Sequence, residues 1–159
     1  AVVEEVFGIA PSVLDVLAQE TRLKDVIARL ADAGIVTSVF IDAEPEQIEA
    51  AARIGARVCE IHTGPYAHAF HAAGRDAEAP AVLAELDKIR TAGEVVRSLG
   101  MRFNAGHALN YYNVEPIARL HGIRELHIGH AIVSRAVFVG LRAAVAEMKR
   151  LMREAAQGA

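Results

Sequence analysis

The sequence predicts an α/β fold made of four parallel strand–helix units. Short runs rich in β-branched residues alternate with longer amphipathic segments, and glycines stand at several junctions. This alternation requires crossover connections, which join parallel strands through a helix. With 159 residues, 53% of them hydrophobic, the chain has the length of one domain and enough apolar side chains for a core.

The predicted elements follow one another without a low-complexity linker. Residues 21–33 form an amphipathic helix that stops at Gly34, ahead of the first strand. Strands are expected at residues 36–43, 57–64, 101–107 and 124–130, the last two including their loops. Helices are expected at residues 44–55, 79–100 and 113–122, and in a terminal region, residues 131–157, split near Gly140. A polar, histidine-containing loop is expected over residues 65–79.

The first twenty residues differ from the rest of the single predicted domain, residues 1–159. The string "PSVLD" has the pattern of a helix start, with Ser12 as N-cap and Asp15 at the capping-box position. We therefore expect residues 1–20 to form an N-terminal helical cap on the strand–helix units.

The composition argues against a nucleic-acid partner. The formal net charge is −3 with both signs interspersed, whereas nucleic-acid-binding domains carry a basic face. Aromatic residues make up 5% and tryptophan is absent, so no base-stacking platform is expected. The single cysteine, Cys59, excludes an internal disulfide and a cysteine-based zinc site, and its apolar strand predicts simple core packing.

The sequence also shows no pattern typical of a signal peptide or of a membrane-spanning helix. Glu4 and Glu5 interrupt the start, and no basic segment precedes an apolar run. The longest apolar region, residues 131–148, contains Arg135 and Arg142 and has the spacing of an amphipathic helix. The expectation is a soluble, cytoplasmic protein with no membrane partner.

Four strand–helix units leave a choice between two architectures. A complete (β/α)8 barrel takes about 250 residues, and four parallel strands alone have two open edges. The units therefore form either a small open α/β sheet or one half of a TIM barrel that something else completes.

Polar residues gather where the predicted strands end. They are Asp42 after the first strand, Glu60 and His62 in the second, Asn104, Gly106 and His107 in the third, and Gly129 and His130 after the fourth. Parallel α/β folds bind ligands at the carboxyl ends of their strands, so these residues make up the candidate site.

Glu60 has a direct chemical argument for function. It lies between Cys59 and Ile61 in a strand covered on both faces, where a carboxylate must be paired, hydrogen-bonded or protonated. These states suit acid–base catalysis, and the structural alternative is an ion pair with an arginine. His62 shares the face of Glu60 and either orients it, holds a ligand or has a structural role.

The other candidates divide by position. His107, in the glycine loop after "NAG", is expected to be functional, whereas His127, inside the fourth strand, is expected in the core or facing the helices. Asp42 either caps the following helix or turn, or belongs to the site. The histidines expected to be solvated are His68, His71 and His121.

Two Gly-His pairs end neighbouring strands. Gly106 and His107 follow the third strand, and Gly129 and His130 follow the fourth and lead directly into a helix. Backbone N–H groups of a glycine turn beside a helix N-terminus form an anion site. Loops after the last strands of a barrel often bind phosphate in this way, so the pairs predict a phosphate ligand.

Long contiguous strings resemble one enzyme family. They are "FIDAEPEQIEAAARIGA", "EIHTGPYA", "FNAGHALNYYNV" and "ELHIGHAIVSRAVFVGLRAAVAEMKRLM", and the similarity covers about residues 21–155. They resemble the second half of pyridoxine 5′-phosphate synthase, which implies strands five to eight of a TIM barrel from an octameric enzyme. The resemblance also implies condensation of 1-deoxy-D-xylulose 5-phosphate with 3-amino-2-oxopropyl phosphate, without a metal or an organic cofactor.

The resemblance implies roles for particular residues. Glu60 and His107 match catalytic residues, the histidine as a proton donor or acceptor. Gly129 and His130 match a phosphate-binding pair. Ala108 stands where the family usually has a substrate-binding glycine, and its methyl group is expected to narrow the site or disturb a backbone contact. The candidate supporting residues are His62 and Asn104.

Part of the family's machinery has no counterpart in this sequence. The first half of the family supplies another catalytic histidine, another glutamate and phosphate-holding arginines, which residues 1–35 do not resemble. The leading hypothesis is a half-barrel, impaired or inactive alone, that binds phosphorylated small molecules or inorganic phosphate and pairs with a second copy into a homodimer or higher homo-oligomer. One alternative is a non-catalytic scaffold, engineered or truncated, that binds phosphate and self-associates. Another is a metal-dependent hydrolase with zinc on His62, His107 and His130, against which the resemblance argues.

Overall fold

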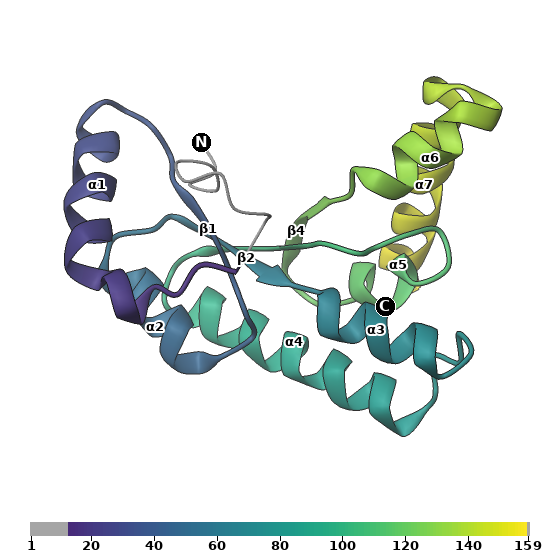
Figure 1. The fold of residues 1–159 in the computed structure, drawn as a ribbon, viewed down its shortest axis with the longest axis horizontal. Coiled ribbons are helices and arrows are strands. Elements are labelled where there is room, and N and C mark those ends of the chain that lie inside the picture. Colours follow the sequence, from purple (N-terminus) through teal and green to yellow (C-terminus); the bar gives the residue numbers. More distant parts are fainter. Residues whose placement is uncertain (1–12, 159) are drawn as a thin grey trace.

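A computed structural model describes residues 13–158 of the chain (Figure 1). The strands are β1 (Ser38–Ile41), β2 (Val58–His62), β3 (Arg102–Gly106) and β4 (Ile123–His127). The helices are α1 (Glu20–Asp32), α2 (Pro45–Arg53), α3 (Gly64–Ala72), α4 (Pro80–Ser98), α5 (Val114–Ala118), α6 (His130–Val139) and α7 (Leu141–Gln157), with a 3-10 turn, η1 (Leu17–Gln19), before α1. Ser12, predicted as an N-cap, lies outside the described residues.

The four strands form one parallel sheet in sequence order, β1-β2-β3-β4. Each strand is followed by at least one helix, so the predicted α/β class with parallel strand–helix units is confirmed. The predicted strand positions are also confirmed, and each strand is shorter than the run that predicted it. In this order β1 and β4 are the edge strands of the sheet.

The ladder between β3 and β4 contains a bulge. Phe103 lies opposite Ile123, but the next residue, Asn104, lies opposite Glu125. Arg124 is therefore an extra residue in β4, as in other β-bulges. The extra residue changes which side chains of β4 share a face with those of β3.

One face of the sheet packs against helices. Its side chains include Val39, Ile41, Cys59, Ile61 and Phe103, which are at most 1% exposed and belong to the hydrophobic core. Figure 1 shows α2 and α4 along this side of the strands, where α2 contacts β1 and α4 contacts β2 and β3. Burial of such side chains contributes about 1.5–3 kcal/mol each to folding, so this core holds the strand ends in place.

The opposite face, which we call the inner face, carries the polar side chains. Phe40, Glu60, Asn104 and Glu125 lie in one row across the four strands, because each is the register partner of its neighbour. The expected alternation in β2 is confirmed, with Glu60 on this face and its two apolar neighbours on the other.

Proline and glycine set several helix boundaries. Pro45 and Pro80 stand in the first turns of α2 and α4, where a missing N–H costs no helical hydrogen bond. Gly55 and Gly100 follow these helices with φ of 88° and 77°, the left-handed conformation that commonly ends a helix. Gly140, with φ of 83°, separates α6 from α7, and the predicted split of the terminal region is confirmed.

Residues 65–79 were expected to be a loop, but the structure places most of α3 within them. This helix buries Tyr66 and Phe70, which are four residues apart and so lie on one side. His68 and His71 are exposed, as expected, on the other side. The polar side chains led to the prediction of a loop. The segment is a helix because the two aromatic rings pack against the rest of the core.

The segment before η1 is tied to β1 and α2. The Leu14 N–H donates to the Phe40 carbonyl oxygen at 2.9 Å, along the outer edge of β1. Asp15 Oδ1 accepts a hydrogen bond from the Ala18 N–H at 3.1 Å, three residues further on. The predicted capping-box bond would instead join Asp15 to Ser12, which lies outside the described residues. Gln47 of α2 donates to Asp15 Oδ1 at 2.9 Å. These bonds hold the segment against the sheet.

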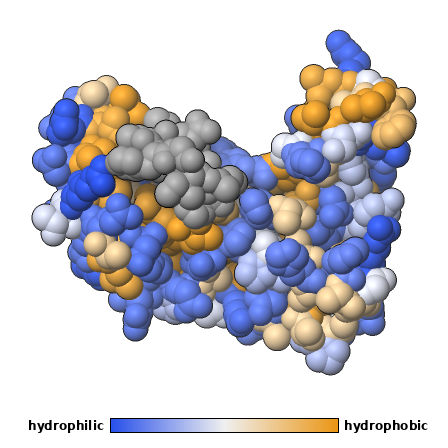
Figure 2. Space-filling view, viewed as in Figure 1, coloured by the Kyte–Doolittle hydropathy of each residue, from blue (hydrophilic) through white to orange (hydrophobic). Residues whose placement is uncertain are grey.

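Apolar side chains are exposed over α6 and the start of α7, in the upper right of Figure 2. The residues of this surface, which we call the α6 patch, are Val133, Val137, Phe138, Val139 and Leu141, each between 41% and 86% exposed. Contiguous apolar surface of this kind marks a contact region. A separate question is membrane insertion: no helix within residues 13–158 is both long and apolar enough to span a bilayer.

Candidate functional site

A hollow at the carboxyl ends of the strands, which we call the carboxyl-end cavity, collects most of the predicted site residues. Its lining residues are Phe40, Glu60, His107, Ala108, Leu109, Asn110, His127, Ile128, Gly129, His130 and Ala131. All five residues predicted to be catalytic or phosphate-binding are among them. The two supporting candidates are not lining residues but are next to them. The His62 ring packs against the ring of His107, and Asn104 is the register partner of Glu60.

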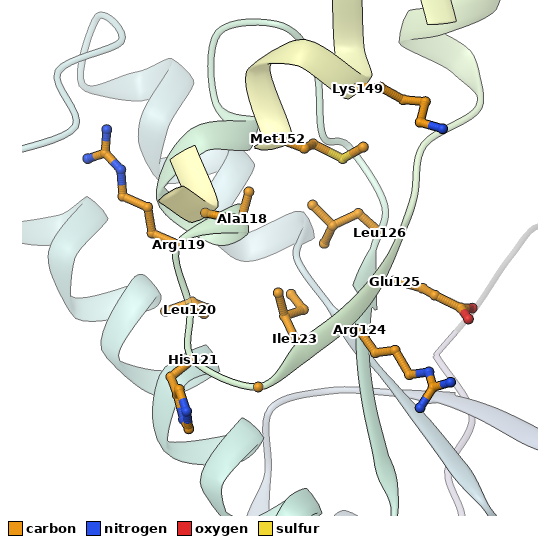
Figure 3. A pocket seen from close by; sticks show the side chains of 12 residues that line it. Ala118, Arg119, Leu120, His121, Ile123, Arg124, Glu125, Leu126, Lys149 and Met152 are labelled. Carbon is orange, nitrogen blue, oxygen red and sulfur yellow. The ribbon is translucent and has the colours of Figure 1, made fainter. Parts of the chain in front are cut away.

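A larger hollow lies beside β4 and contains none of the predicted site residues (Figure 3). Its walls come from α5, β4 and α7, and Ile123, Leu126 and Met152 surround its centre. Parallel α/β sheets bind ligands at the carboxyl ends of strands, so the carboxyl-end cavity is the candidate site although it is the smaller hollow.

Glu60 is buried at the centre of the inner face, with 7% of its surface exposed. Its Oε2 lies 2.6 Å from His127 Nδ1, so its ion pair is with a histidine and not with an arginine, which was the structural alternative. Gly106 gives the carboxylate room, because a Cβ at that position would collide with Glu60 Oε1. The structure therefore pairs this buried carboxylate and leaves it at the wall of the cavity.

The expectation that His127 lies in the core or faces the helices is wrong. The bulge sets His127 opposite Gly106, on the inner face. Its Nδ1 contacts Glu60, and its Nε2 lies 3.7 Å from Glu125 Oε2. The hydrogen bond to Glu60 raises the pKa of His127 above its ordinary value; partial burial opposes the rise, and Glu125 adds a smaller increase.

Asn104 lies between Glu60 and Glu125 in the inner-face row and is 3% exposed. Its Nδ2 donates to Glu125 Oε2 at 3.2 Å. Its Oδ1 is buried and has no hydrogen-bond partner within the described part of the chain. Buried polar atoms are nearly always satisfied in folded proteins, so this oxygen is a free acceptor beside the cavity wall.

His62 is held by an acidic residue on the neighbouring strand. Its Nδ1 lies 2.9 Å from Asp42 Oδ1. Asp42 therefore binds His62 and does not cap α2, whose N-cap residue is Glu44. The His62 ring packs edge-on against the rings of His107 and Phe40, with centroid distances of 5.0 and 5.1 Å. His62 thus supports the catalytic candidate His107 instead of orienting Glu60.

The loop after β3 is strained at two residues. His107 and Ala108 have φ of 81° and 57°, in the left-handed region that residues with a Cβ rarely adopt. The Thr63 hydroxyl lies 2.6 Å from the Gly106 carbonyl oxygen and 2.5 Å from that of His107. Asn113 Nδ2 donates to the Ala108 carbonyl oxygen at 3.2 Å. Two side chains from other segments therefore hold the loop in this conformation.

Sequence reasoning missed or misplaced three residues of the site. Asn113 is the N-cap residue of α5, but its side chain makes no capping bond and instead donates to the loop after β3. Thr63 carried no signal beyond its position after a strand. For His127 there was a signal, because Leu126 and Ile128 pack against the core and alternation turns the residue between them the other way.

The turn before α6 forms the remaining wall of the cavity. Gly129 is the N-cap residue of this helix, with φ of −108°, a value open to any residue. Apart from its two chain neighbours, no residue within 13–158 has a heavy atom within 4 Å of where a Cβ at Gly129 would lie. Neither the backbone nor the packing therefore demands glycine here, and the N–H groups of the first turn, at His130 and beyond, are the positive end of the helix.

The histidines do not come together as a metal centre. Among residues 13–158 there is no group of three His, Cys, Asp or Glu side chains placed to hold a metal ion. The zinc hypothesis needed such a group from His62, His107 and His130. What the cavity does bring together is a carboxylate, imidazoles and a helix N-terminus, which suit proton transfer and anion binding.

Known proteins match almost the whole chain. The model of the family described as "Pyridoxal phosphate biosynthesis protein PdxJ" matches residues 10–154. Pyridoxine 5′-phosphate synthase of Azoarcus sp. (strain BH72) is 86% identical over 145 residues, which are 91% of this chain and 58% of the relative. The enzyme of the same name from Dechloromonas aromatica (strain RCB) is 84% identical over 91% of this chain and 57% of its own. That from Rhodopirellula baltica (strain DSM 10527 / NCIMB 13988 / SH1) is 52% identical over 87% of this chain and 53% of its own.

The chain spans little more than half the length of the curated relatives it matches, in keeping with half of a barrel. The family match starts at residue 10 and so includes part of the segment 1–20 that was expected to stand apart. Because the family model covers most of the chain and the relatives are this similar, the chain belongs to the pyridoxal phosphate biosynthesis protein PdxJ family.

Proposed function

We propose that this chain supplies the second half of a pyridoxine 5′-phosphate synthase active site. The proposed reaction condenses 1-deoxy-D-xylulose 5-phosphate with 3-amino-2-oxopropyl phosphate in vitamin B6 biosynthesis, in the cytoplasm and without a metal or organic cofactor. The observation that carries the proposal is the meeting of Glu60, His107 and the turn of Gly129 and His130 in one cavity.

Glu60 and His107 are the proposed acid–base groups. A condensation that forms a ring removes protons from carbon and delivers them to leaving oxygen atoms. A buried carboxylate and an imidazole do both near neutral pH when their positions are fixed. Glu60 is fixed by its ion pair with His127, and His107 by the loop contacts of Thr63 and by the ring of His62.

The turn of Gly129 and His130 is the proposed phosphate site. Both proposed substrates are phosphate esters, and backbone N–H groups at a helix N-terminus bind such anions. The space beside Gly129 supports this role, because no described residue other than its chain neighbours comes within 4 Å of a Cβ position there. Ala108 lines the same cavity next to His107, and its methyl group is proposed to narrow the site.

The 159 residues carry only part of the family's catalytic set, so we propose that the chain alone is impaired or inactive in synthesis. We also propose that it self-associates into a homodimer or higher homo-oligomer. Two features support association: β4 is an edge strand, and the α6 patch exposes apolar side chains beside it along the chain. The other edge, β1, is partly occupied by Leu14.

A product-formation assay with both phosphorylated substrates tests the catalytic proposal. The purified chain is compared with Glu60→Gln and His107→Asn, and His121→Gln serves as the matched control because that histidine is exposed and outside the cavity. Weak activity that disappears in both site variants and persists in the control is the expected result. Activity that survives in the site variants overturns the assigned roles.

A non-catalytic scaffold that binds phosphate and self-associates is the second candidate, and the α6 patch favours it. Thermal stabilisation by inorganic phosphate, lost in Gly129→Val and accompanied by no product from any variant, would support this reading. Sedimentation gives the mass in solution, and a monomer that persists at micromolar concentration overturns the proposed self-association.

A further inference from the structure

We propose that His127 is a positioning residue, which holds the Glu60 carboxylate in one orientation through Nδ1 and leaves the second carboxylate oxygen for a ligand. The inference rests on the proposed function, because it refines the part that Glu60 plays in the carboxyl-end cavity. It concerns a residue to which the family resemblance gave no role.

The geometry of the pair carries the proposal. The distance of 2.6 Å between His127 Nδ1 and Glu60 Oε2 is at the short end for a hydrogen bond between charged groups. The Glu60 side chain is 10% exposed and that of His127 is 40% exposed. The carboxylate is therefore withdrawn from solvent, and the imidazole that holds it reaches solvent.

Two backbone features make this contact possible. The bulge at Arg124 turns His127 to the inner face, opposite Gly106. Gly106 has no side chain, and a Cβ there would overlap Glu60 Oε1 and come within 3.0 Å of His127 Cβ. Oε2 is thus fixed by the imidazole and Oε1 lies over the glycine, so the carboxylate has one orientation at the cavity wall.

The charges around His127 favour Glu60 as its main partner. Glu60 contacts it from β2, Glu125 from β4, and His107 and His130 line the same cavity. Glu125 is more distant, at 3.7 Å from Nε2, and its side chain is 59% exposed, so solvent screens its charge. The raised pKa of His127 agrees with this order, because the bond to Glu60 is its largest cause.

A titration of the histidine rings tests the proposal in the full chain. Long-range correlation spectra of the ¹⁵N-labelled protein follow the protonation of each imidazole with pH, and His127→Gln assigns the signal. We expect the pKa of His127 to lie above the ordinary histidine value, to fall in Glu60→Gln, and to fall less in Glu125→Gln. Gly106→Ala keeps both partners but displaces Oε1, so it is expected to lower the pKa as well.

The opposite pattern overturns the proposal. A pKa of His127 that is unchanged in Glu60→Gln and lowered in Glu125→Gln would make His127 the partner of the exposed carboxylate only. If Glu60→Gln does not fold, the unmodified chain still decides, because a pKa at or below the ordinary histidine value excludes the pair. The titration needs no turnover, so a chain without synthase activity contradicts the proposed function and leaves this result intact.

Discussion

Asp42 Oδ1 and His62 Nδ1 lie 2.9 Å apart at the carboxyl ends of β1 and β2, and the His62 ring packs edge-on against that of His107. The Asp42 side chain is 48% exposed, whereas that of His62 is 19% exposed. The partly exposed Asp42 side chain therefore contacts His62, and His62 in turn contacts the ring of His107, the proposed catalytic residue. The effect of Asp42 on the cavity is indirect, because it acts through the orientation of His62.

Replacing Asp42 by alanine should disturb His107 more than it disturbs stability. The pair is partly exposed, so the free energy of unfolding is expected to fall by less than about 1 kcal/mol. The His62 ring loses its acceptor and turns, which shifts the His107 ring signals in proton NMR spectra. Asp25→Ala, on the exposed side of α1, is the matched control and should leave those signals unchanged.

Ala108→Gly should stabilise the fold. Ala108 has φ of 57°, where a Cβ costs about 1–2 kcal/mol. Glycine avoids this strain but increases the conformational entropy of the unfolded chain, which offsets part of the gain. The net expected gain in the free energy of unfolding, measured by urea denaturation, is up to about 1 kcal/mol. Ala84→Gly, at an exposed position inside α4, should lose about 1 kcal/mol, and equal effects at both positions would contradict the strain argument.

Stability should decline with rising pH because of His127. Glu60 raises the pKa of His127 in the folded chain above its value in the unfolded chain, so protonation favours the folded state. This contribution is complete below the unfolded-state pKa of about 6.5 and is lost as the pH rises through the folded-state pKa. Urea denaturation across that range should show the free energy of unfolding declining with pH in the unmodified chain and declining less in Glu60→Gln. Parallel pH profiles for the two proteins would contradict the assignment of this decline to the pair of Glu60 and His127.

Cys59 should not react with thiol reagents in the folded chain. Burial, with a smaller contribution from the charge of Glu60, raises the pKa of the Cys59 thiol to about 12. The thiolate is the reactive form, and the residue is also 0% exposed. Mass spectrometry after treatment with a maleimide near neutral pH should show no adduct until urea unfolds the protein. Rapid labelling without denaturant would contradict the buried position of β2.

The fold class could be predicted because local patterns determine it. Alternation in β2 separates Glu60 from Cys59 and Ile61, and the glycines that end α2 and α4 mark where those helices stop. Helix α3 escaped prediction because its polar surface carries His68 and His71, while Tyr66 and Phe70 become a helical face only against the rest of the core.

The site was predictable where strand order alone places a residue. Glu60 lies in β2, and His107 and Gly129 follow β3 and β4, so parallel pairing brings all three to one cavity. Partners were harder to predict, because the contact of Glu60 with His127 depends on a bulge that adds one residue to β4. The sequence does not mark such an irregularity, since it arises only when two strands pair.

The hydrogen bond from Leu14 to the Phe40 carbonyl oxygen gives the two borders of the sheet different characters. If both edge strands were free, copies could join head to tail, β4 of one to β1 of the next, and this addition could continue into a fibre. With β1 partly covered, the proposed self-association would use β4, and two β4 edges would meet around a two-fold axis. An assembly of that kind would be complete at two molecules, so the backbone contact of Leu14 would favour a closed dimer over a fibre.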